Sequence, residues 1–324
     1  MTAKPPIGLI GLGIMGSAMS ANLMRAGYHV IGYDLLARRR RNHRQAGGEE
    51  AHDCRDVARR AAIVICSLPS PEALLQVAAE LALVWPPHAR RVRSPAGSSR
   101  TRRIVIETST LPIAVKQKAR RALAARGTIL LDCPLSGTGA QARAKDLVVY
   151  ASGDRGAYRR VVPVLEGFAR AHYYVGAFGA GSKMKFVANL LVAIHNVAAA
   201  EAFVLARKAG LDPATVLKVI GDGAGSSRMF QVRGPMMVKG DYSDATMKLE
   251  VWQKDMRIIA DFAREVGCPT PLFAATAPIY AAAIAMGRQA EDTAAVCAVL
   301  EEMAGARRGA QNRASKKFKV KGSN

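Results

Sequence analysis

The N-terminal region has the sequence Ile7-Gly8-Leu9-Ile10-Gly11-Leu12-Gly13-Ile14-Met15-Gly16, a short apolar strand that runs directly into a GxGxxG turn. Apolar residues at helical spacing follow, and a second apolar strand then ends at Asp34. In such a motif Gly11 permits a tight turn, Gly13 lets a pyrophosphate approach the backbone, and Gly16 lets helix and strand pack closely. The complete strand–turn–helix–strand–acid order predicts dinucleotide binding, in preference to a glycine-rich turn of another α/β protein.

Asp34 determines which dinucleotide we expect. Its carboxylate can accept hydrogen bonds from the ribose hydroxyls and would repel the 2′-phosphate of NADP, so the expected cofactor is NAD. Four arginines, Arg38 to Arg41, follow shortly and could hold that phosphate, which leaves NADP as an alternative. We interpret these arginines in the first place as an exposed face of the next helix.

Three further apolar strands are each followed by a segment with small or polar residues. The carboxyl ends of parallel strands meet at the ligand-binding edge of an open α/β sheet, so these segments are candidate site residues. They are Ser67-Leu68-Pro69, Glu107-Thr108-Ser109-Thr110 and Cys133-Pro134-Leu135-Ser136-Gly137-Thr138. Ser109 either caps the following helix or, with Thr110, contacts cofactor or substrate. Ser136 to Thr138 offer hydroxyls and backbone N–H groups that suit a carboxylate, or they form only a tight turn.

The second half of the chain begins at Gly179-Ala180-Gly181 and shows helical periodicity, with alanine-rich segments between residues 190 and 286. Lys185 and Asn189 are four residues apart and therefore share one face of the first helix. The positive end of a helix dipole disfavours a charged lysine, which lowers its pKa in the direction that acid–base catalysis needs. Two solvated lysines at a helix start are the alternative interpretation.

These patterns predict an α/β fold in which an N-terminal Rossmann doubly wound sheet is followed by an all-α C-terminal domain. We expect a dinucleotide-binding domain over residues 1–178 and a helical substrate and dimerisation domain over residues 179–306. Residues 307–324 are basic and are expected to be a disordered tail. Residues 86–103, rich in Pro, Arg, Ser and Gly, are expected to form an exposed basic loop.

Composition restricts the possible classes of protein. The 324 residues are 50% hydrophobic, as expected for a globular chain, and carry a net charge of +22. Much of the excess charge lies in runs that are typical of solvated loops and tails, so we do not expect nucleic acid as the partner. Five cysteines without a CxxC motif indicate reduced, buried thiols in the cytoplasm. The six histidines lack metal-ligand spacing, and no metal site is expected.

Residues 187–206 form an apolar stretch long enough to span a membrane. Asn189, His195, Asn196 and Glu201 interrupt this stretch, so we expect no membrane association. We expect instead a helix buried between domains or subunits, and subunits that pair through it into a homodimer or homotetramer.

Five blocks of the chain, in order, resemble the β-hydroxyacid dehydrogenases, the family of 3-hydroxyisobutyrate dehydrogenase and tartronate semialdehyde reductase. The resemblance covers about residues 7 to 300. The blocks are Gly8 to Gly16 with Asn22; Leu68-Pro69; Ser109-Thr110 with Pro112; Asp132 to Gly137; and Gly179 to Gly181 with Lys185 and Asn189. A later pair, Lys254-Asp255, also matches the family pattern, although by sequence alone it is a charged pair on an exposed helix face.

The resemblance implies a role for each matched residue. Leu68, Pro69 and Thr110 would line the cofactor, and Lys254 would reach it from the helical domain. Ser136 and Gly137 would bind the substrate carboxylate, with Thr138 and Gln141 bordering the substrate. Lys185 would be the catalytic acid/base, and Asn189 would hold the substrate beside it.

The chain departs from the family pattern at three positions near these residues. Thr138 replaces the second of two glycines that usually follow the serine, and Lys145 replaces a later glycine. Ala188 stands where many members have an asparagine. These departures leave the identity of the substrate open, and we do not assign 3-hydroxyisobutyrate.

The function expected from this resemblance is NAD(P)-dependent hydride transfer between a small, anionic 3-hydroxy acid and its semialdehyde. Two alternatives remain. A non-catalytic protein on the same scaffold could bind a dinucleotide or nucleic acid, which the net charge favours and the presence of Lys185 disfavours. Imine reduction on the same fold is the other alternative, and there the lysine is usually replaced.

Overall fold

The structure is a computed structural model that describes residues 4–85 and 103–306. The expectations for the basic tail, and for the basic loop apart from Arg103, lie outside the described residues. The chain divides into two compact units, Met1–Phe186 and Val187–Asn324. This boundary lies inside a helix, whereas the domain division expected from the sequence precedes that helix.

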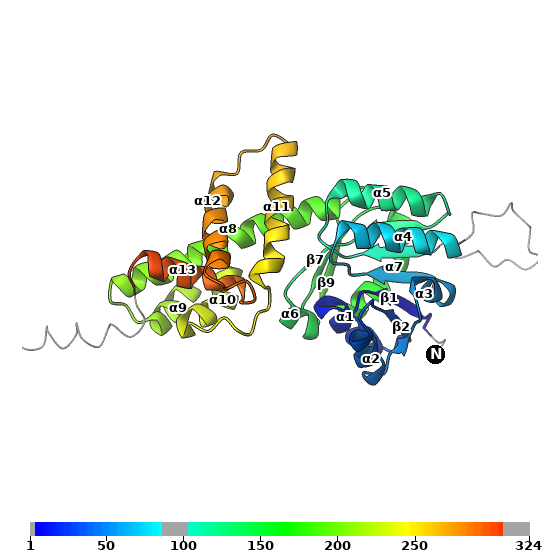
Figure 1. The fold of residues 1–324 in the computed structure, drawn as a ribbon, viewed down its shortest axis with the longest axis horizontal. Coiled ribbons are helices and arrows are strands. Elements are labelled where there is room, and N and C mark those ends of the chain that lie inside the picture. Colours follow the sequence, from blue (N-terminus) through cyan, green and yellow to red (C-terminus); the bar gives the residue numbers. More distant parts are fainter. Residues whose placement is uncertain (1–3, 86–102, 307–324) are drawn as a thin grey trace, which may run out of the picture. The chain divides into compact units, whose positions relative to one another are not determined.

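The first unit contains a six-stranded parallel sheet with the order β3-β2-β1-β4-β5-β6 (Figure 1). The strands are β1 Ile7–Ile10, β2 Val30–Tyr33, β3 Glu49–Glu50, β4 Ile63–Cys66, β5 Ile104–Glu107 and β6 Ile129–Asp132. Strand order reverses between β1 and β4, which is the position where such sheets bind ligands. Ile10 aligns with both Tyr33 and Cys66, Cys66 aligns with Glu107, and Glu107 aligns with Asp132. The segments singled out in the sequence therefore leave the sheet at one edge.

Helices cover both faces of this sheet. Alternate side chains of the strands, such as Ile7 and Leu9, pack with α1 (Ile14–Arg25) and α7 (Arg155–Phe168). The opposite side chains, such as Ile10 and Val64, pack with three other helices, which are α3 Cys54–Arg60, α4 Pro71–Val84 and α5 Ile113–Ala124. These strands are apolar on both faces because both faces are buried. The expected doubly wound Rossmann fold is confirmed.

A smaller three-stranded sheet completes the first unit. It consists of β7 Leu135–Ser136, β8 Val148–Ala151 and β9 Ala171–Tyr174, in that order, with β7 antiparallel to β8. The two remaining short helices of this unit are α2 Ala37–Gln45, the helix expected after Asp34, and α6 Gly139–Arg143. The two-residue strands β3 and β7 were not predicted, because two residues carry no periodicity.

The described part of the second unit is helical and contains no strand, as expected. The helices are α8 Ala180–Lys208, which begins in the first unit, α9 Pro213–Gly221, α10 Arg228–Lys239, α11 Leu249–Glu265, α12 Pro271–Ala285, a 3₁₀ turn Thr293–Ala295, and α13 Val296–Met303. Asp292 is fully buried and connects several segments of this unit. Its carboxylate lies 3.0 Å from Arg233 of α10 and accepts hydrogen bonds from the backbone N–H groups of Thr246, Met247 and Ala294. Burial alone would raise the pKa of Asp292, but the guanidinium and the N–H donors lower it below its ordinary value.

Helix α8 is, among the described helices, the one that is long and apolar enough to cross a membrane. In its most apolar 18-residue window, 44% of the residues are buried within the protein. Core helices of water-soluble proteins have the same length and composition, so this feature by itself assigns no membrane location.

All five cysteines are free thiols. Four are buried, as expected, and Cys268 is exposed. Burial raises the pKa of the Cys54 thiol to about 12, and the nearby carboxylates of Glu80 and Asp53 add to the rise. Cys54 is therefore a protonated packing residue at neutral pH.

Candidate active site

The glycine turn after β1 has the geometry that its sequence predicts. Gly11 has a φ of +94°, and a Cβ at this position would lie 2.1 Å from the Ser67 carbonyl oxygen. A Cβ at Gly16 would lie 1.8 Å from the Gly11 carbonyl oxygen, so neither position admits a side chain. Gly13 differs, since a Cβ there would have Arg39 Nη1, at 3.9 Å, as its nearest contact among the described side chains. The space over Gly13 fits the close approach of a pyrophosphate.

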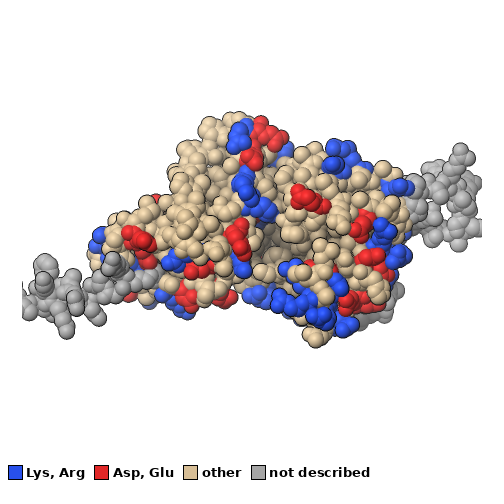
Figure 2. All heavy atoms as spheres, viewed as in Figure 1, with Lys and Arg blue, Asp and Glu red and all other residues tan. Residues whose placement is uncertain are grey.

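Asp34 connects this glycine turn to the segment that follows β2. Its carboxylate accepts the Leu12 N–H at 2.8 Å and the Leu36 N–H at 2.9 Å, and it lies 3.2 Å from Arg39 Nη1. Arg40 donates to the Asp34 carbonyl oxygen at 2.7 Å. Of the four arginines, Arg38, Arg39 and Arg41 are exposed, as interpreted, and Arg40 is half-buried. Arg39 and Arg40 also contact Asp34. Figure 2 shows Lys and Arg side chains gathered over α2.

Leu68 and Thr110 lie in two different segments, and Ser109, next to Thr110, hydrogen-bonds to Leu68. The Ser109 hydroxyl accepts the Leu68 N–H at 2.8 Å. The next helix, α5, has Pro112 at its N-terminus and no side-chain cap, so Ser109 does not cap it. Of the two interpretations of Ser109, the helix cap is wrong. The hydroxyl instead holds together the two segments expected to line the cofactor.

The segment expected to bind the substrate follows β6. Ser136 ends β7, and Gly137 has a φ of +132° with no space for a side chain, because a Cβ would lie 2.7 Å from Leu147 Cδ2. Thr138 and Gln141 form a reciprocal cap at the start of α6, each binding the backbone N–H of the other. Their side chains thus stabilise the turn that presents Ser136 and Gly137.

Helix α6 packs against α1, the helix that follows the glycine turn. A Cβ at Gly139 would lie 2.5 Å from Ile14 Cγ2, and Asn22 donates to the Ala142 carbonyl oxygen at 2.7 Å. Lys145, at the family's glycine position, adopts a φ of +59°, and it is the one non-glycine residue with positive φ among those described. The backbone at Lys145 thus has the left-handed conformation that glycine adopts readily.

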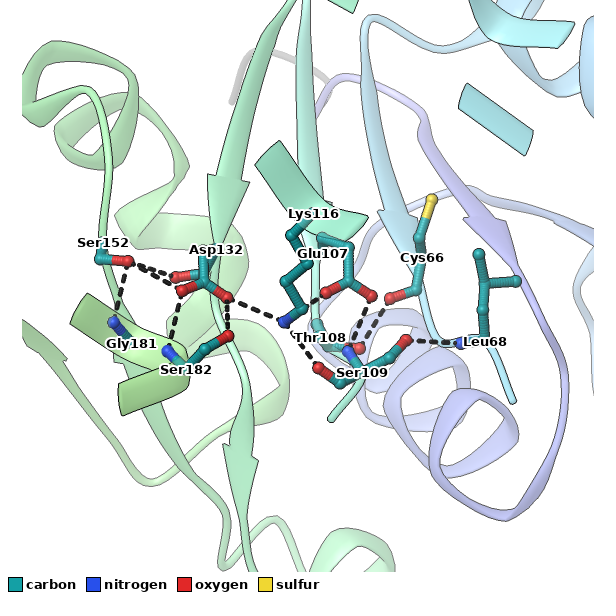
Figure 3. Close-up of polar contacts among 10 residues, drawn as sticks. All are labelled: Cys66, Leu68, Glu107, Thr108, Ser109, Lys116, Asp132, Ser152, Gly181 and Ser182. Carbon is teal, nitrogen blue, oxygen red and sulfur yellow. Dashed lines mark hydrogen bonds and ion pairs between the residues drawn. The ribbon is translucent and has the colours of Figure 1, made fainter. Parts of the chain in front are cut away.

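Lys185 lies in the second turn of α8. Its side chain is 9% exposed, whereas Lys183 in the same helix is exposed. The start of this helix is bound to Asp132, whose carboxylate accepts both the N–H and the hydroxyl of Ser182 at 2.8 Å (Figure 3). This contact was not predicted; its signal in the sequence is an acidic residue, Asp132, at the end of a buried strand.

Asn189 and Lys254 lie in the second unit and share one carboxylate. The Asn189 side-chain amide donates to Asp255 at 3.0 Å, and Lys254 Nζ lies 3.3 Å from the same side chain. Asp255 is only 5% exposed. The interpretation of Lys254-Asp255 as a pair on an exposed helix face is therefore wrong for Asp255, which fixes the orientation of the Asn189 amide.

Comparison with known proteins agrees with this geometry. Residues 6–176 match the model of the NAD binding domain of 6-phosphogluconate dehydrogenase, and residues 179–300 match that of NADP-dependent 3-hydroxyisobutyrate dehydrogenase. The chain is 33% identical to an L-threonate dehydrogenase of Cupriavidus necator, over 90% of this chain and 94% of that protein. It is 29% identical to glyoxylate/succinic semialdehyde reductase 2 of Arabidopsis thaliana, over 91% of this chain and 79% of that protein.

A solved structure gives the same result. The crystal structure of 3-hydroxyisobutyrate dehydrogenase from Salmonella typhimurium superposes with a TM-score of 0.79 at 29% identity, and the match covers 91% of this chain and 100% of that one. Both halves of the chain and their order are thus those of one group of enzymes. This chain belongs to the β-hydroxyacid dehydrogenase family of NAD(P)-dependent oxidoreductases.

Proposed function

We propose that this protein interconverts a small 3-hydroxy acid and its semialdehyde, with Lys185 as the general acid/base. The observation that carries the proposal is the burial of Lys185 in a helix whose first turn is fixed to the Rossmann sheet. Relatives named for threonate, succinic semialdehyde and 3-hydroxyisobutyrate support the substrate class. All three names denote small carboxylates with a hydroxyl or aldehyde group.

The bound nicotinamide supplies the acceptor or donor of the hydride. In the oxidation, Lys185 Nζ takes the proton of the substrate hydroxyl, and in the reduction it returns a proton to the aldehyde oxygen. Ser136 and Gly137 hold the substrate carboxylate, and Asn189, oriented by Asp255, holds the reacting end. Gly11 to Gly16 with Asp34 bind the dinucleotide, while Leu68, Pro69, Thr110 and Lys254 border it.

The organisation of the chain follows from these roles. We propose that residues 1–178 bind the dinucleotide, and that residues 179–306 contribute to substrate binding and to subunit pairing in a cytoplasmic homodimer or homotetramer. Exposed apolar side chains along α8, including Val187, Leu191 and Leu205, support pairing through this helix. Light scattering tests it, and a monomer at micromolar concentration would contradict it.

The experiment that tests the activity is a screen that follows the absorbance of the reduced nicotinamide. Purified protein is incubated with NAD or NADP and a panel of 3-hydroxy acids, and in reverse with small semialdehydes. We expect turnover with at least one member of the panel, and its loss in Lys185→Ala. Turnover that persists in Lys185→Ala would contradict the role of the lysine. Dinucleotide binding without any turnover would favour the non-catalytic alternative, and a salt-dependent DNA titration would then test nucleic-acid binding.

A further inference from the structure

Lys116, on α5, is a fully buried lysine that the proposed reaction does not use. Its ammonium group lies 2.6 Å from Glu107, 2.8 Å from Asp132 and 2.7 Å from the Ser109 carbonyl oxygen. Figure 3 shows it between the two carboxylates, at the ends of neighbouring strands. The ammonium group donates hydrogen bonds to Asp132 and to the Ser109 carbonyl oxygen, and its contact with Glu107 is an ion pair.

On one side, Lys116 contacts the residue that anchors α8. Asp132 accepts two hydrogen bonds from Ser182, and Ser152 donates to Asp132 at 3.2 Å while it accepts the Gly181 N–H at 3.0 Å. A Cβ at Gly181 would lie 2.3 Å from the Tyr150 carbonyl oxygen, so the first turn of α8 packs directly on the backbone of β8. Asp132 thereby sets the position of the turn that precedes Lys185.

On the other side, Lys116 contacts the segments expected to line the cofactor. The Ser109 carbonyl oxygen accepts from Lys116, the Ser109 N–H donates to Glu107 at 2.9 Å, and the Ser109 hydroxyl accepts from Leu68. Ser109 is thus held at its N–H, its carbonyl group and its hydroxyl. Displacement of Lys116 would remove the contact at the carbonyl group and would leave Glu107, which accepts the Ser109 N–H, without its cation.

The three charged side chains of this cluster depend on one another. Lys116, Glu107 and Asp132 are each 0% exposed and comprise one cation and two anions. Burial alone would lower the pKa of Lys116, but Asp132 and Glu107 reverse this effect and raise it above its ordinary value, so the lysine stays charged. Buried ion pairs add little net stability over apolar packing, whereas removal of one partner leaves an uncompensated charge. Loss of Lys116 would therefore leave two buried carboxylates without a cation and would disturb the positions of Asp132 and Glu107.

We propose that Lys116 is a positioning residue that holds the first turn of α8 in register with the Ser109–Leu68 contact, and so places Lys185 for proton transfer. This inference rests on the proposed role of Lys185. Lys116 itself touches neither substrate nor cofactor in the proposal. A misplacement of about 1 Å in such a site is enough to cost on the order of 100-fold in rate.

The test compares Lys116→Met with Lys118→Met, a matched change of an exposed lysine on the same helix. Turnover is expressed per dinucleotide-binding site, measured by titration, so that unfolded protein does not count. We expect Lys116→Met to lower kcat per site by roughly 30-fold, with KM changed less than threefold, and Lys118→Met to match the wild type. A purely structural role would reduce the number of sites and leave kcat per site unchanged, which would overturn the proposal.

A second readout needs no activity. Amide hydrogen exchange of residues 180–186 in the protein without dinucleotide reports whether the first turn of α8 is held. We expect exchange at least tenfold faster in Lys116→Met than in Lys118→Met. Unchanged exchange would overturn the proposal even if kcat fell, because Lys116 would then act by a route other than the helix.

If Lys116→Met fails to fold, Glu107→Gln and Ser182→Ala test the same connection with smaller changes. Glu107 and Ser182 are joined through Lys116 and Asp132 in the contacts described, so the effects of the two changes on kcat per site should be coupled. We expect the double variant to differ from the product of the single effects by more than threefold, whereas independent effects would overturn the proposal. Failure of this inference is separate from failure of the proposed function, which the substrate screen and Lys185→Ala decide.

Discussion

The guanidinium of Arg39 lies 3.2 Å from the Asp34 carboxylate, which also accepts the Leu12 N–H of the glycine turn. A cation and an anion thus share the end of β2, where the adenosine ribose is expected. Asp34 favours the free 2′-hydroxyl of NAD, and Arg39 offers a partner to the 2′-phosphate of NADP. The residue on which the expectation of NAD rests is thus in contact with one of the four arginines on which the NADP alternative rests.

Arg39→Ala tests how this pair sets cofactor preference. The change removes the cation and leaves Asp34 to repel the 2′-phosphate, so kcat/KM with NADP should fall at least about tenfold more than kcat/KM with NAD. Steady-state kinetics with both dinucleotides measure the ratio. Arg38→Ala, at an exposed position of the same helix, is the control. Equal losses with NAD and NADP in Arg39→Ala would show that Arg39 does not discriminate between them.

Lys145→Gly should stabilise the protein. A residue with a side chain pays roughly 1–2 kcal/mol for the left-handed conformation, and the greater freedom of glycine in the unfolded chain offsets part of the gain. We expect a net increase of about 0.5–1 kcal/mol in the free energy of unfolding, measured by urea denaturation. Lys145→Ala removes the same charge but keeps the Cβ, and should change stability little. Equal effects of the two variants would assign the gain to charge instead of backbone strain.

His43 should make stability depend on pH. Its ring lies between Gly32 and Gly48, where an added Cβ would approach it to 2.5 Å and 2.1 Å, and it contacts the Ser20 hydroxyl at 3.2 Å. Burial lowers its pKa below the ordinary value of 6.5. The unfolded chain therefore takes up a proton at a higher pH than the folded protein, and stability is lost as the pH falls from 6.5 toward the folded pKa.

His43→Phe keeps a planar ring at this position and removes the titration. Urea denaturation of both proteins between about pH 8 and pH 5 should show a steeper loss of stability in the wild type. The difference amounts to about 1.4 kcal/mol for each unit that separates the folded and unfolded pKa values. Parallel curves for the two proteins would contradict a role of His43 in this pH dependence.

Much of the fold could be predicted because its signals are local. The apolar runs at β1, β2, β4, β5 and β6 and the glycine turn each act within a few residues. The parallel order then follows from the rules that govern α/β sheets. The division into a strand-rich first half and a helical second half was predictable for the same reason.

The contacts that complete the site could not be predicted, because they join residues far apart in the chain. Lys116 meets Glu107 and Asp132, and Asp132 meets Ser182 across 50 positions. Nothing in the immediate sequence of a lysine on an amphipathic helix distinguishes a fully buried ion partner from a solvated charge. Asp255 was placed on an exposed face for the same reason, and only the packing of α11 shows that it is buried.

The most direct test of the proposed reaction is the rate of hydride transfer in a single turnover, compared in the wild type, Lys185→Ala and Lys183→Ala. The two lysines lie two residues apart in one helix, and only Lys185 is buried. With the substrate identified in the screen, we predict that Lys185→Ala loses roughly 10²–10⁴-fold in rate while dinucleotide affinity stays within threefold, and that Lys183→Ala keeps the wild-type rate. A rate within a few-fold of the wild type in Lys185→Ala would contradict the assignment of Lys185 as the general acid/base.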